Sequence, residues 1–244
     1  MYEKHKQKIA KRIESYKSDK ELQDFVKKFY KIIETRTWGE NHFWLGVPIF
    51  QVLMDLIAYQ EIIWEVKPDL IIETGIKFGG SLIFSASMLT LLEACGEIEN
   101  GKVIGVDIKL PTGIRTHPLF NKIIMLKGSS TSEEIIKKVR ELAKNKKRIV
   151  VFLDSNHSHN HVLGELRLYA PLVSIGSYIV VEDTFVEDLG YRGKTRPSQW
   201  NKGKNPRTAV WKYLEENKNF VIDKAIELRK IFVGNPDGYL KRIK

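Results

Sequence analysis

Cysteine and long apolar runs are both scarce in this chain. Of its 244 residues only one, Cys95, is a cysteine, which excludes an internal disulfide and suits a reducing compartment. No stretch reaches the roughly 18 apolar residues of a membrane helix, and the lysine-rich start lacks the apolar core of a secretion signal. These absences predict a soluble, cytoplasmic protein with no membrane span.

Two glycine-rich phosphate-binding patterns are missing as well. The dinucleotide pattern G-x-G-x-x-G places a pyrophosphate on a helix N-terminus, and the Walker pattern G-x-x-x-x-G-K-[ST] wraps a phosphate chain. Neither occurs in the sequence. Phosphate cradles of these two kinds are therefore excluded.

A different turn is present at residues 69–81, where an apolar strand runs into an acid and three glycines. Gly75, Gly79 and Gly80 have no Cβ, so the backbone can approach a ligand closely. Ser81 is expected to cap the helix that follows. An ordinary strand–turn–helix corner is the alternative interpretation of this segment.

Glu73 lies at the end of that strand, at the place where a pyrophosphate would bind in a dinucleotide site. A carboxylate repels phosphate but attracts a cation, and S-adenosylmethionine carries an ammonium and a sulfonium group. A second β-branched strand ends at Asp107, where an acid can bind both hydroxyls of a ribose. Asp107 fits NAD as well as S-adenosylmethionine.

A third strand is predicted over residues 122–128 and leads into Gly128-Ser129-Ser130-Thr131. The small hydroxyl side chains of this loop can meet an adenine edge or cap the next helix. Capping is the simpler role for at least one of them.

Three carboxylates follow the fourth and fifth predicted strands: Asp154, Glu182 and Asp183. The ends of parallel strands lie side by side at one edge of a sheet, so these acids are expected to converge. Like charges in a partly buried site repel unless a cation lies among them. Oxygen ligands favour Mg²⁺, and less selectively Mn²⁺ or Ca²⁺. Helix caps or salt bridges are the alternative roles.

Three histidines come next, in Ser155-Asn-His157-Ser-His159-Asn-His161. His157 lies just past the strand, where a neutral imidazole can take a proton from a hydroxyl at the metal. His161 is expected to face the same side, in a structural or a functional role, whereas His159 points elsewhere. An iron site of two histidines and one carboxylate is an alternative, which would make the protein a hydroxylase.

The alternation of strands and helices over 67–183 predicts an α/β fold with a mostly parallel, doubly wound sheet. We expect helices in an N-terminal extension at 1–65 and a catalytic domain at 66–244. Asn205-Pro206 predicts a helix start, and the segments 220–222 and 225–233 predict a closing antiparallel hairpin. A lid is expected at about 185–205.

The net charge of +10 raises the possibility of a nucleic-acid partner. Much of the positive charge lies in segments that read as solvated helix faces. The scattered Trp200, Trp211 and Tyr213 do not form a stacking platform. An RNA methyltransferase therefore stays as the alternative to an enzyme of small molecules, and a basic binding protein without catalysis is less favoured.

The order of these motifs resembles the cephalosporin hydroxylase/rhamnosyl O-methyltransferase family over roughly residues 40–240. The likeness rests on Glu73-Thr74-Gly75, Gly79-Gly80-Ser81, Gly105-Val106-Asp107, Gly128-Ser129-Ser130, Leu153-Asp154-Ser155-x-His157, His161-Val162, Gly176-Ser177-Tyr178 and Val181-Glu182-Asp183-Thr184. It also includes Trp44 to Pro48, Gln51, Asp55, Tyr59-Gln60-Glu61 and the tail from Asn235 to Arg242.

This resemblance implies a Rossmann-like class I methyltransferase fold, S-adenosylmethionine as donor, Mg²⁺ held by Asp154, Glu182 and Asp183, and His157 as general base. The cofactor contacts that we expect are Glu73, Thr74, Gly75, Gly79, Ser81, Asp107, Ser129, Ser130 and Asp154. Glu73 would hold the amino-acid part, Asp107 the ribose and Ser129 the adenine side. The acceptor would be a hydroxyl of a sugar or glycosylated small molecule, and a homo-oligomer is expected.

Overall fold

Short runs of β-branched and aliphatic residues build the central sheet of this computed structural model, which describes residues 2–189 and 200–244. Such runs suit strands that are covered on both faces. The strand order is β5-β4-β3-β6-β7-β9-β8. The strands are β3 (Leu70–Thr74), β4 (Lys102–Asp107), β5 (Ile123–Lys127), β6 (Ile149–Leu153), β7 (Tyr178–Val181), β8 (Phe220–Ile222) and β9 (Tyr239–Arg242).

Strands β3 to β7 are parallel, and β9 pairs antiparallel with both β7 and β8. Chain order reverses direction between β3 and β6, the position at which open α/β sheets bind ligands. The predicted α/β fold with a mostly parallel, doubly wound sheet is confirmed.

The predicted C-terminal hairpin is wrong in its second strand. Residues Lys224–Lys230 form helix α9, capped by the Asp223 side chain, which accepts a hydrogen bond from the Ala225 amide. The partner of β8 is β9, further along the chain. The antiparallel pair exists, but a helix and a loop connect its strands.

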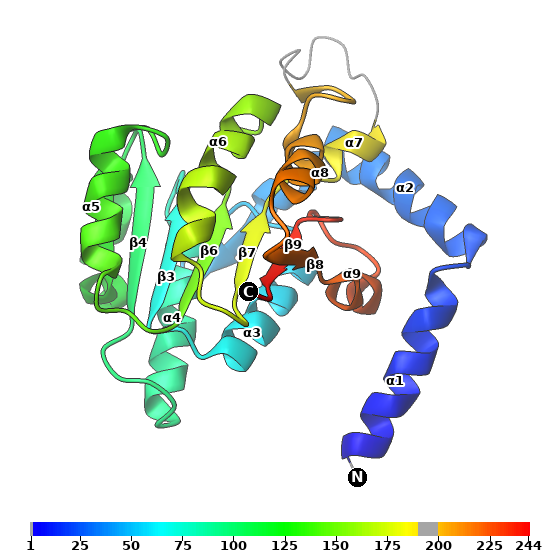
Figure 1. The fold of residues 1–244 in the computed structure, drawn as a ribbon, viewed down its shortest axis with the longest axis horizontal. Helices are drawn as coiled ribbons and strands as arrows, with labels where there is room; N and C mark the ends of the chain where they lie inside the picture. The colour runs from blue at the N-terminus through cyan, green and yellow to red at the C-terminus, as the bar shows by residue number, and fades with distance from the viewer. Residues whose placement is uncertain (1, 190–199) are drawn as a thin grey trace.

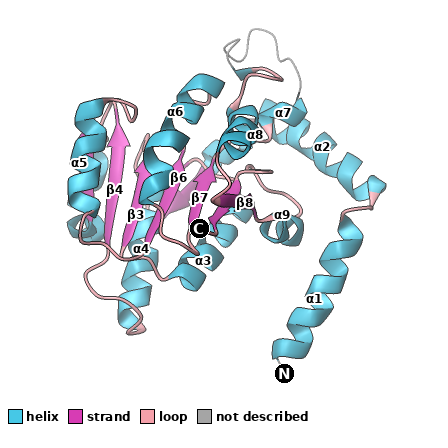
Figure 2. Cartoon of the chain, in the orientation of Figure 1, coloured by secondary structure: helices cyan, strands magenta, loops and turns pink. Residues whose placement is uncertain are grey.

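Helices cover both faces of the sheet (Figures 1 and 2). Buried side chains of α3 (Leu53–Val66) and α4 (Gly80–Ala94) form one core with the sheet. The opposite core contains those of α5 (Glu133–Ala143), α6 (His159–Tyr169) and α8 (Pro206–Glu216). Helix α8 starts as predicted, with Asn205 as its cap and Pro206 in its first turn.

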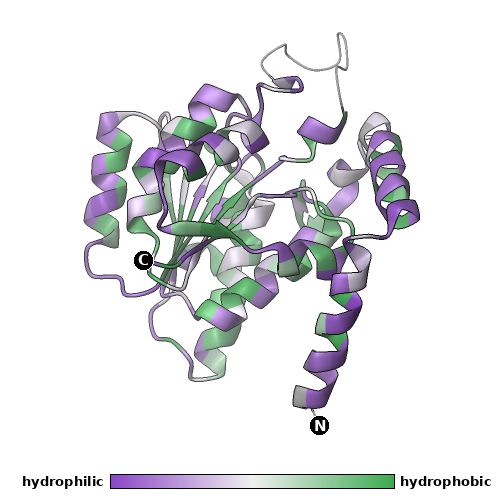
Figure 3. Cartoon of the chain, turned by 45° about the vertical axis from the view of Figure 1, so that its right-hand side comes forward, coloured by the Kyte–Doolittle hydropathy of each residue, from purple (hydrophilic) through white to green (hydrophobic). Residues whose placement is uncertain are grey.

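The N-terminal helices α1 (Tyr2–Tyr16) and α2 (Lys20–Thr35) precede the sheet, and α1 extends away from the body (Figure 1). Hydrophilic residues predominate along α1, whereas the sheet is hydrophobic (Figure 3). Val26 and Tyr30 of α2 pack against Phe185 and α7 (Val186–Leu189). Among the described residues, no helix has the length and apolar character needed to cross a membrane.

Short elements complete the chain. They are the paired strands β1 (His42–Trp44) and β2 (Val47–Ile49) and the 3-10 helices η1 (Trp38–Asn41), η2 (Gly113–Thr116), η3 (Pro118–Lys122) and η4 (Ala170–Leu172). Helix α3, which falls in the predicted extension 1–65, contributes Leu56, Ile62 and Ile63 to the main core. The proposed division of the chain at residue 65 stays a prediction.

Candidate active site

The carboxyl ends of β3, β4, β6 and β7 meet at one edge of the sheet. The strand register pairs Thr74 with Val106 on one side and with Leu153 on the other, and Leu153 with Val181. The acids at or just after these strand ends are Glu73, Asp107, Asp154, Glu182 and Asp183. The fold therefore brings together the five acids that the sequence singled out.

The glycine-rich turn after β3 is pressed between two other segments. Gly75 has a φ of +79°, and a Cβ added there would lie 2.0 Å from the carbonyl oxygen of Asp154. A Cβ on Gly80 would lie 2.2 Å from the carbonyl oxygen of Pro48. Glycine is thus required at both positions by neighbouring backbone. Gly79, at φ +89°, is the N-cap residue of α4.

Ser81 does not cap α4, contrary to our prediction. Its hydroxyl donates a hydrogen bond to the Glu73 carboxylate instead, because Gly79 starts the helix two residues earlier. Glu73 is only 2% exposed. Burial raises the pKa of Glu73 to about 8; the bond from Ser81 opposes this rise and the charge of Asp107 adds to it. A cationic ligand group beside Glu73 would relieve this cost.

Asp107 is oriented by backbone amides. Its Oδ2 accepts hydrogen bonds from Ile76 N at 2.8 Å and Lys77 N at 3.3 Å, and its Oδ1 accepts one from Lys109 N at 3.0 Å. The carboxylate is therefore fixed against the glycine-rich turn. Thr74, at the end of β3, is fully buried, and its Oγ1 has no hydrogen-bond partner within the described part of the chain.

The loop after β5 carries Ser129 and Ser130. The capping role that we considered for this loop belongs to Ser132, whose side chain accepts a hydrogen bond from Ile135 N. Ser129 Oγ lies 3.1 Å from Thr131 Oγ1, while Ser130 is buried against α6 and contacts His161. Neither predicted cofactor serine is a helix cap.

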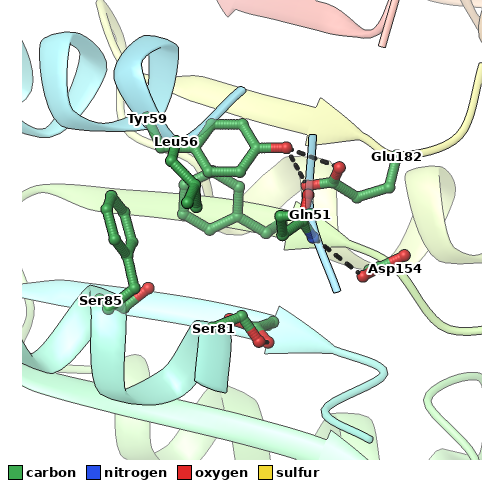
Figure 4. A pocket seen from close by; sticks show the side chains of 10 residues that line it. Gln51, Leu56, Tyr59, Ser81, Ser85, Asp154 and Glu182 are labelled. Carbon is green, nitrogen blue, oxygen red and sulfur yellow. Dashed lines mark hydrogen bonds between the residues drawn. The ribbon is translucent and has the colours of Figure 1, made fainter. Parts of the chain in front are cut away.

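The acids after β6 and β7 have protein donors (Figure 4). Gln51 Nε2 donates to Asp154 Oδ2 at 3.2 Å. The Tyr59 hydroxyl donates to Glu182 Oε2 at 2.6 Å, and Asn235 Nδ2 donates to the same oxygen at 2.8 Å. Burial, and then the charges of Glu182 and Asp183, raise the pKa of Asp154 well above its ordinary value. Burial and the charge of Asp55 raise the pKa of Glu182 likewise.

His157 lies between two of these acids. Its Nε2 is 3.7 Å from Asp154 Oδ1 and 3.6 Å from Asp183 Oδ2. The rings of His157 and Trp200 make a T-shaped contact, with ring centroids 4.7 Å apart. A histidine held this way can accept a proton next to the carboxylates.

Within residues 2–189 and 200–244, no three histidine, cysteine or acidic side chains converge in a metal-binding arrangement. Glu182 is turned toward Tyr59 and Asn235, so the three predicted ligands do not point at one spot. The chemistry of the set still suits a hard divalent cation. It consists of carboxylate oxygens, and the charge of Asp183 raises the pKa of both Asp154 and Glu182. The residues fit the ion chemically.

His161 does not face His157, contrary to our prediction. Its Nε2 lies 3.0 Å from Ser130 Oγ and 3.1 Å from Ser155 Oγ. His159 points away, as expected, with its Nδ1 2.7 Å from Thr208 Oγ1. The histidines therefore have three separate environments, and the described residues do not assemble the iron triad that we considered.

The sequence profile of the rhamnosyl O-methyltransferase/CmcI family matches residues 36–243. The chain belongs to this family. The family predicted from the motifs is thus confirmed, and with it the class of enzyme, an O-methyltransferase.

Two curated proteins with sequences similar to this chain are rhamnosyl O-methyltransferases. The rhamnosyl O-methyltransferase of Mycobacterium bovis is 29% identical over 236 residues, which is 92% of this chain and 86% of the relative. That of Mycobacterium leprae is 36% identical over 146 residues, 58% of this chain and 59% of the relative.

Solved structures support the fold. A structure of CmcI with Mg and S-adenosylmethionine superposes with a TM-score of 0.60 and 17% identity, over 84% of this chain and 78% of that one. A structure of the mycinamycin-pathway methyltransferase MycE with Mg, S-adenosylhomocysteine and mycinamycin VI gives 0.52 and 15%, over 88% and 54%. At these identities the likeness concerns the fold, and the predicted class I methyltransferase fold is confirmed.

Sequence reasoning gave no role to three residues that donate hydrogen bonds to the acids of this site: Gln51, Tyr59 and Asn235. A small pocket at the strand edge is lined by Gln51 and Tyr59 together with Glu73, Asp154 and Glu182. Their only sequence signal was membership of the family motifs, because each lies far along the chain from the acid it contacts.

Stability should depend on pH through Glu73. A buried acid with a raised pKa binds its proton more tightly when folded, so the free energy of unfolding falls as pH rises from about 4.5 to about 8. We expect Glu73→Gln to reduce this slope by up to about 1.4 kcal/mol per pH unit. Urea unfolding of both metal-free proteins across this range measures it; parallel slopes would contradict the assignment.

Proposed function

We propose that the protein transfers the methyl group of S-adenosylmethionine to a hydroxyl of a sugar or glycosylated small molecule, with Mg²⁺ as the metal. The observation that carries the proposal is the position of His157 between Asp154 and Asp183 at the ligand-binding edge of the sheet. Family membership and the names of the mycobacterial relatives support methyl transfer to a sugar. The Mg and S-adenosylmethionine of the CmcI structure suggest the cofactors.

In this proposal, residues at the ends of β3, β4 and β5 would hold the cofactor. Glu73 and the turn at Gly75 and Gly79 hold its amino-acid part, since a buried carboxylate attracts the ammonium group. Asp107 would accept hydrogen bonds from the ribose hydroxyls, and Ser129 and Ser130 would contact the adenine. Mn²⁺ or Ca²⁺ can replace Mg²⁺ in an oxygen-ligand site.

Asp154, Glu182 and Asp183 would hold the metal ion. When bound, the ion supplies a positive charge that offsets the three carboxylates and lowers the pKa of an acceptor hydroxyl beside it. A hydrogen bond from Gln51 orients Asp154. Glu182 is oriented by hydrogen bonds from Tyr59, on α3, and from Asn235, in the loop before β9. Asp154 Oδ1 and Glu182 Oε1 keep a lone pair for a ligand.

His157 takes the proton from the acceptor hydroxyl as its oxygen attacks the methyl carbon. S-adenosylmethionine, when bound, would supply the methyl group, and the electron pair of its carbon–sulfur bond would stay on sulfur, so that S-adenosylhomocysteine leaves. The reaction needs the oxygen, carbon and sulfur in line, so positioning supplies much of the rate. Trp200 limits the ring orientations that His157 can adopt.

The acceptor contacts fall partly in the predicted lid at about 185–205, of which residues 190–199 lie outside the described residues. A rhamnoside is the first acceptor to test, given the names of the relatives.

Calorimetric titration with S-adenosylhomocysteine, with and without Mg²⁺, tests the cofactor, and NADH is the control ligand. We expect a Kd in the micromolar range for S-adenosylhomocysteine and no binding of NADH. Transfer of labelled methyl from S-adenosylmethionine to synthetic rhamnosides, with EDTA as the metal-free control, then tests the reaction. Binding of NADH, or labelling unaffected by EDTA, would refute the proposal.

A further inference from the structure

A polar cluster lies beside the strand ends at the ligand-binding edge of the sheet, on the α6 side. Ser130 and Glu165 are buried in it, and Ser155 and His161 are half-buried. His161 Nε2 contacts Ser130 Oγ at 3.0 Å and Ser155 Oγ at 3.1 Å. Ser155 in turn donates to Glu165 Oε1 at 2.7 Å. Glu165 is fully buried. One ring nitrogen thus joins the loop after β5 to the residue that follows Asp154.

Counting protons sets the direction of these bonds. A serine hydroxyl has one proton, and that of Ser155 goes to Glu165. Its oxygen can therefore only accept from His161, so Nε2 carries a proton. Ser130 Oγ is the second acceptor of a hydrogen bond from the same Nε2–H. The proton of Ser130 is then free to be donated elsewhere.

Helix α6 also holds the main chain of Ser130. The Tyr169 hydroxyl donates to the Ser130 carbonyl at 2.9 Å, and Tyr169 is fully buried. Ser130 is consequently fixed at both its side chain and its backbone by one helix. Such double fixation suits a residue whose hydroxyl must point in one direction.

We propose that His161 is a positioning residue. Its Nε2–H occupies the Ser130 oxygen, so that the Ser130 hydroxyl donates its proton to an acceptor nitrogen of the cofactor's adenine. The same N–H links the loop after β5 to Ser155, beside Asp154. The inference rests on the proposed function, which places Ser130 at the adenine. His161 does not touch the reacting atoms, so its effect falls on cofactor affinity.

The test compares S-adenosylhomocysteine affinity, by calorimetry, in the full chain and in Ser130→Ala, His161→Phe and the double variant. We expect each single variant to bind about fivefold more weakly, as for one lost hydrogen bond, and the double variant to bind no more weakly than either. His161→Gln, whose side-chain amide can donate from nearly the same place, should keep wild-type affinity. Circular dichroism melting verifies the fold of each variant.

His159→Phe is the matched control, because His159 lies on the same helix but contacts Thr208. Wild-type affinity in His161→Phe or Ser130→Ala, or a double variant weakened by the product of the single effects, would overturn the inference alone. If His161→Phe does not fold, equal affinities of His161→Gln and wild type support it and a loss in His161→Gln overturns it. A wild-type protein that does not bind S-adenosylhomocysteine would overturn the proposed function as well.

Discussion

The Asp154→Asn variant is expected to lose methyl transfer to the limit of detection while its fold stays intact. Asparagine keeps an oxygen to accept from Gln51 but removes the charge that the metal requires. It also removes one negative charge from a cluster of like charges. Without metal, the variant should therefore be at least as stable as the wild type at pH 8.

Three measurements together check this expectation: labelled methyl transfer, titration with Mg²⁺ or Mn²⁺, and thermal melting in EDTA. Asp24→Asn on the exposed face of α2 is the matched control, and it should change none of them. Turnover near the wild-type level in Asp154→Asn would remove the metal from the mechanism. A large drop in melting temperature would show that Asp154 has a structural role instead.

His157→Asn is expected to lower turnover by about 10²- to 10⁴-fold, the usual range for a lost general base. Because His157 is assigned to the proton and not to the cofactor, affinity for S-adenosylhomocysteine should stay within about twofold, well under the effect of one lost hydrogen bond. The separation of these two effects distinguishes a base from a cofactor ligand.

Steady-state turnover and calorimetry on the same preparation measure both quantities. His159→Asn serves as the control and should keep full turnover, because the His159 imidazole contacts Thr208 and not the acids. If His157→Asn retains more than a tenth of wild-type turnover, another group must accept the proton. Weakened cofactor binding would place His157 in the cofactor site instead.

The sheet could be predicted because its signal is local. A run such as Ile149–Leu153 is too short for a helix, begins with three β-branched residues and is followed by Asp154, so the sequence predicts both the strand and its end. The segment after Asp223 is ambiguous in the same respect, because short mixed runs fit a strand or a helix. The feature that decides for a helix is the cap that the Asp223 side chain provides.

The acids of the site were predictable for a topological reason: parallel strands deliver their last residues to one edge. Their partners were not. Tyr59 and Glu182 are brought together by the packing of α3 on the sheet, and Asn235 arrives from the loop before β9. The predicted cap at Ser81 is wrong for a local reason. A serine at the start of a helix often caps it, but here the hydroxyl of Ser81 donates to the buried carboxylate of Glu73.

The contact between Gly80 and Pro48 bears on how this protein can be shortened. A chain that began at residue 66 would retain every strand of the central sheet but would lose Pro48, Gln51 and Tyr59. With them it would lose the backbone against which the turn is pressed and the donors to two carboxylates. The N-terminal boundary of a minimal catalytic fragment therefore lies upstream of Val47. Truncation design should preserve the short β1–β2 pair as part of the enzyme.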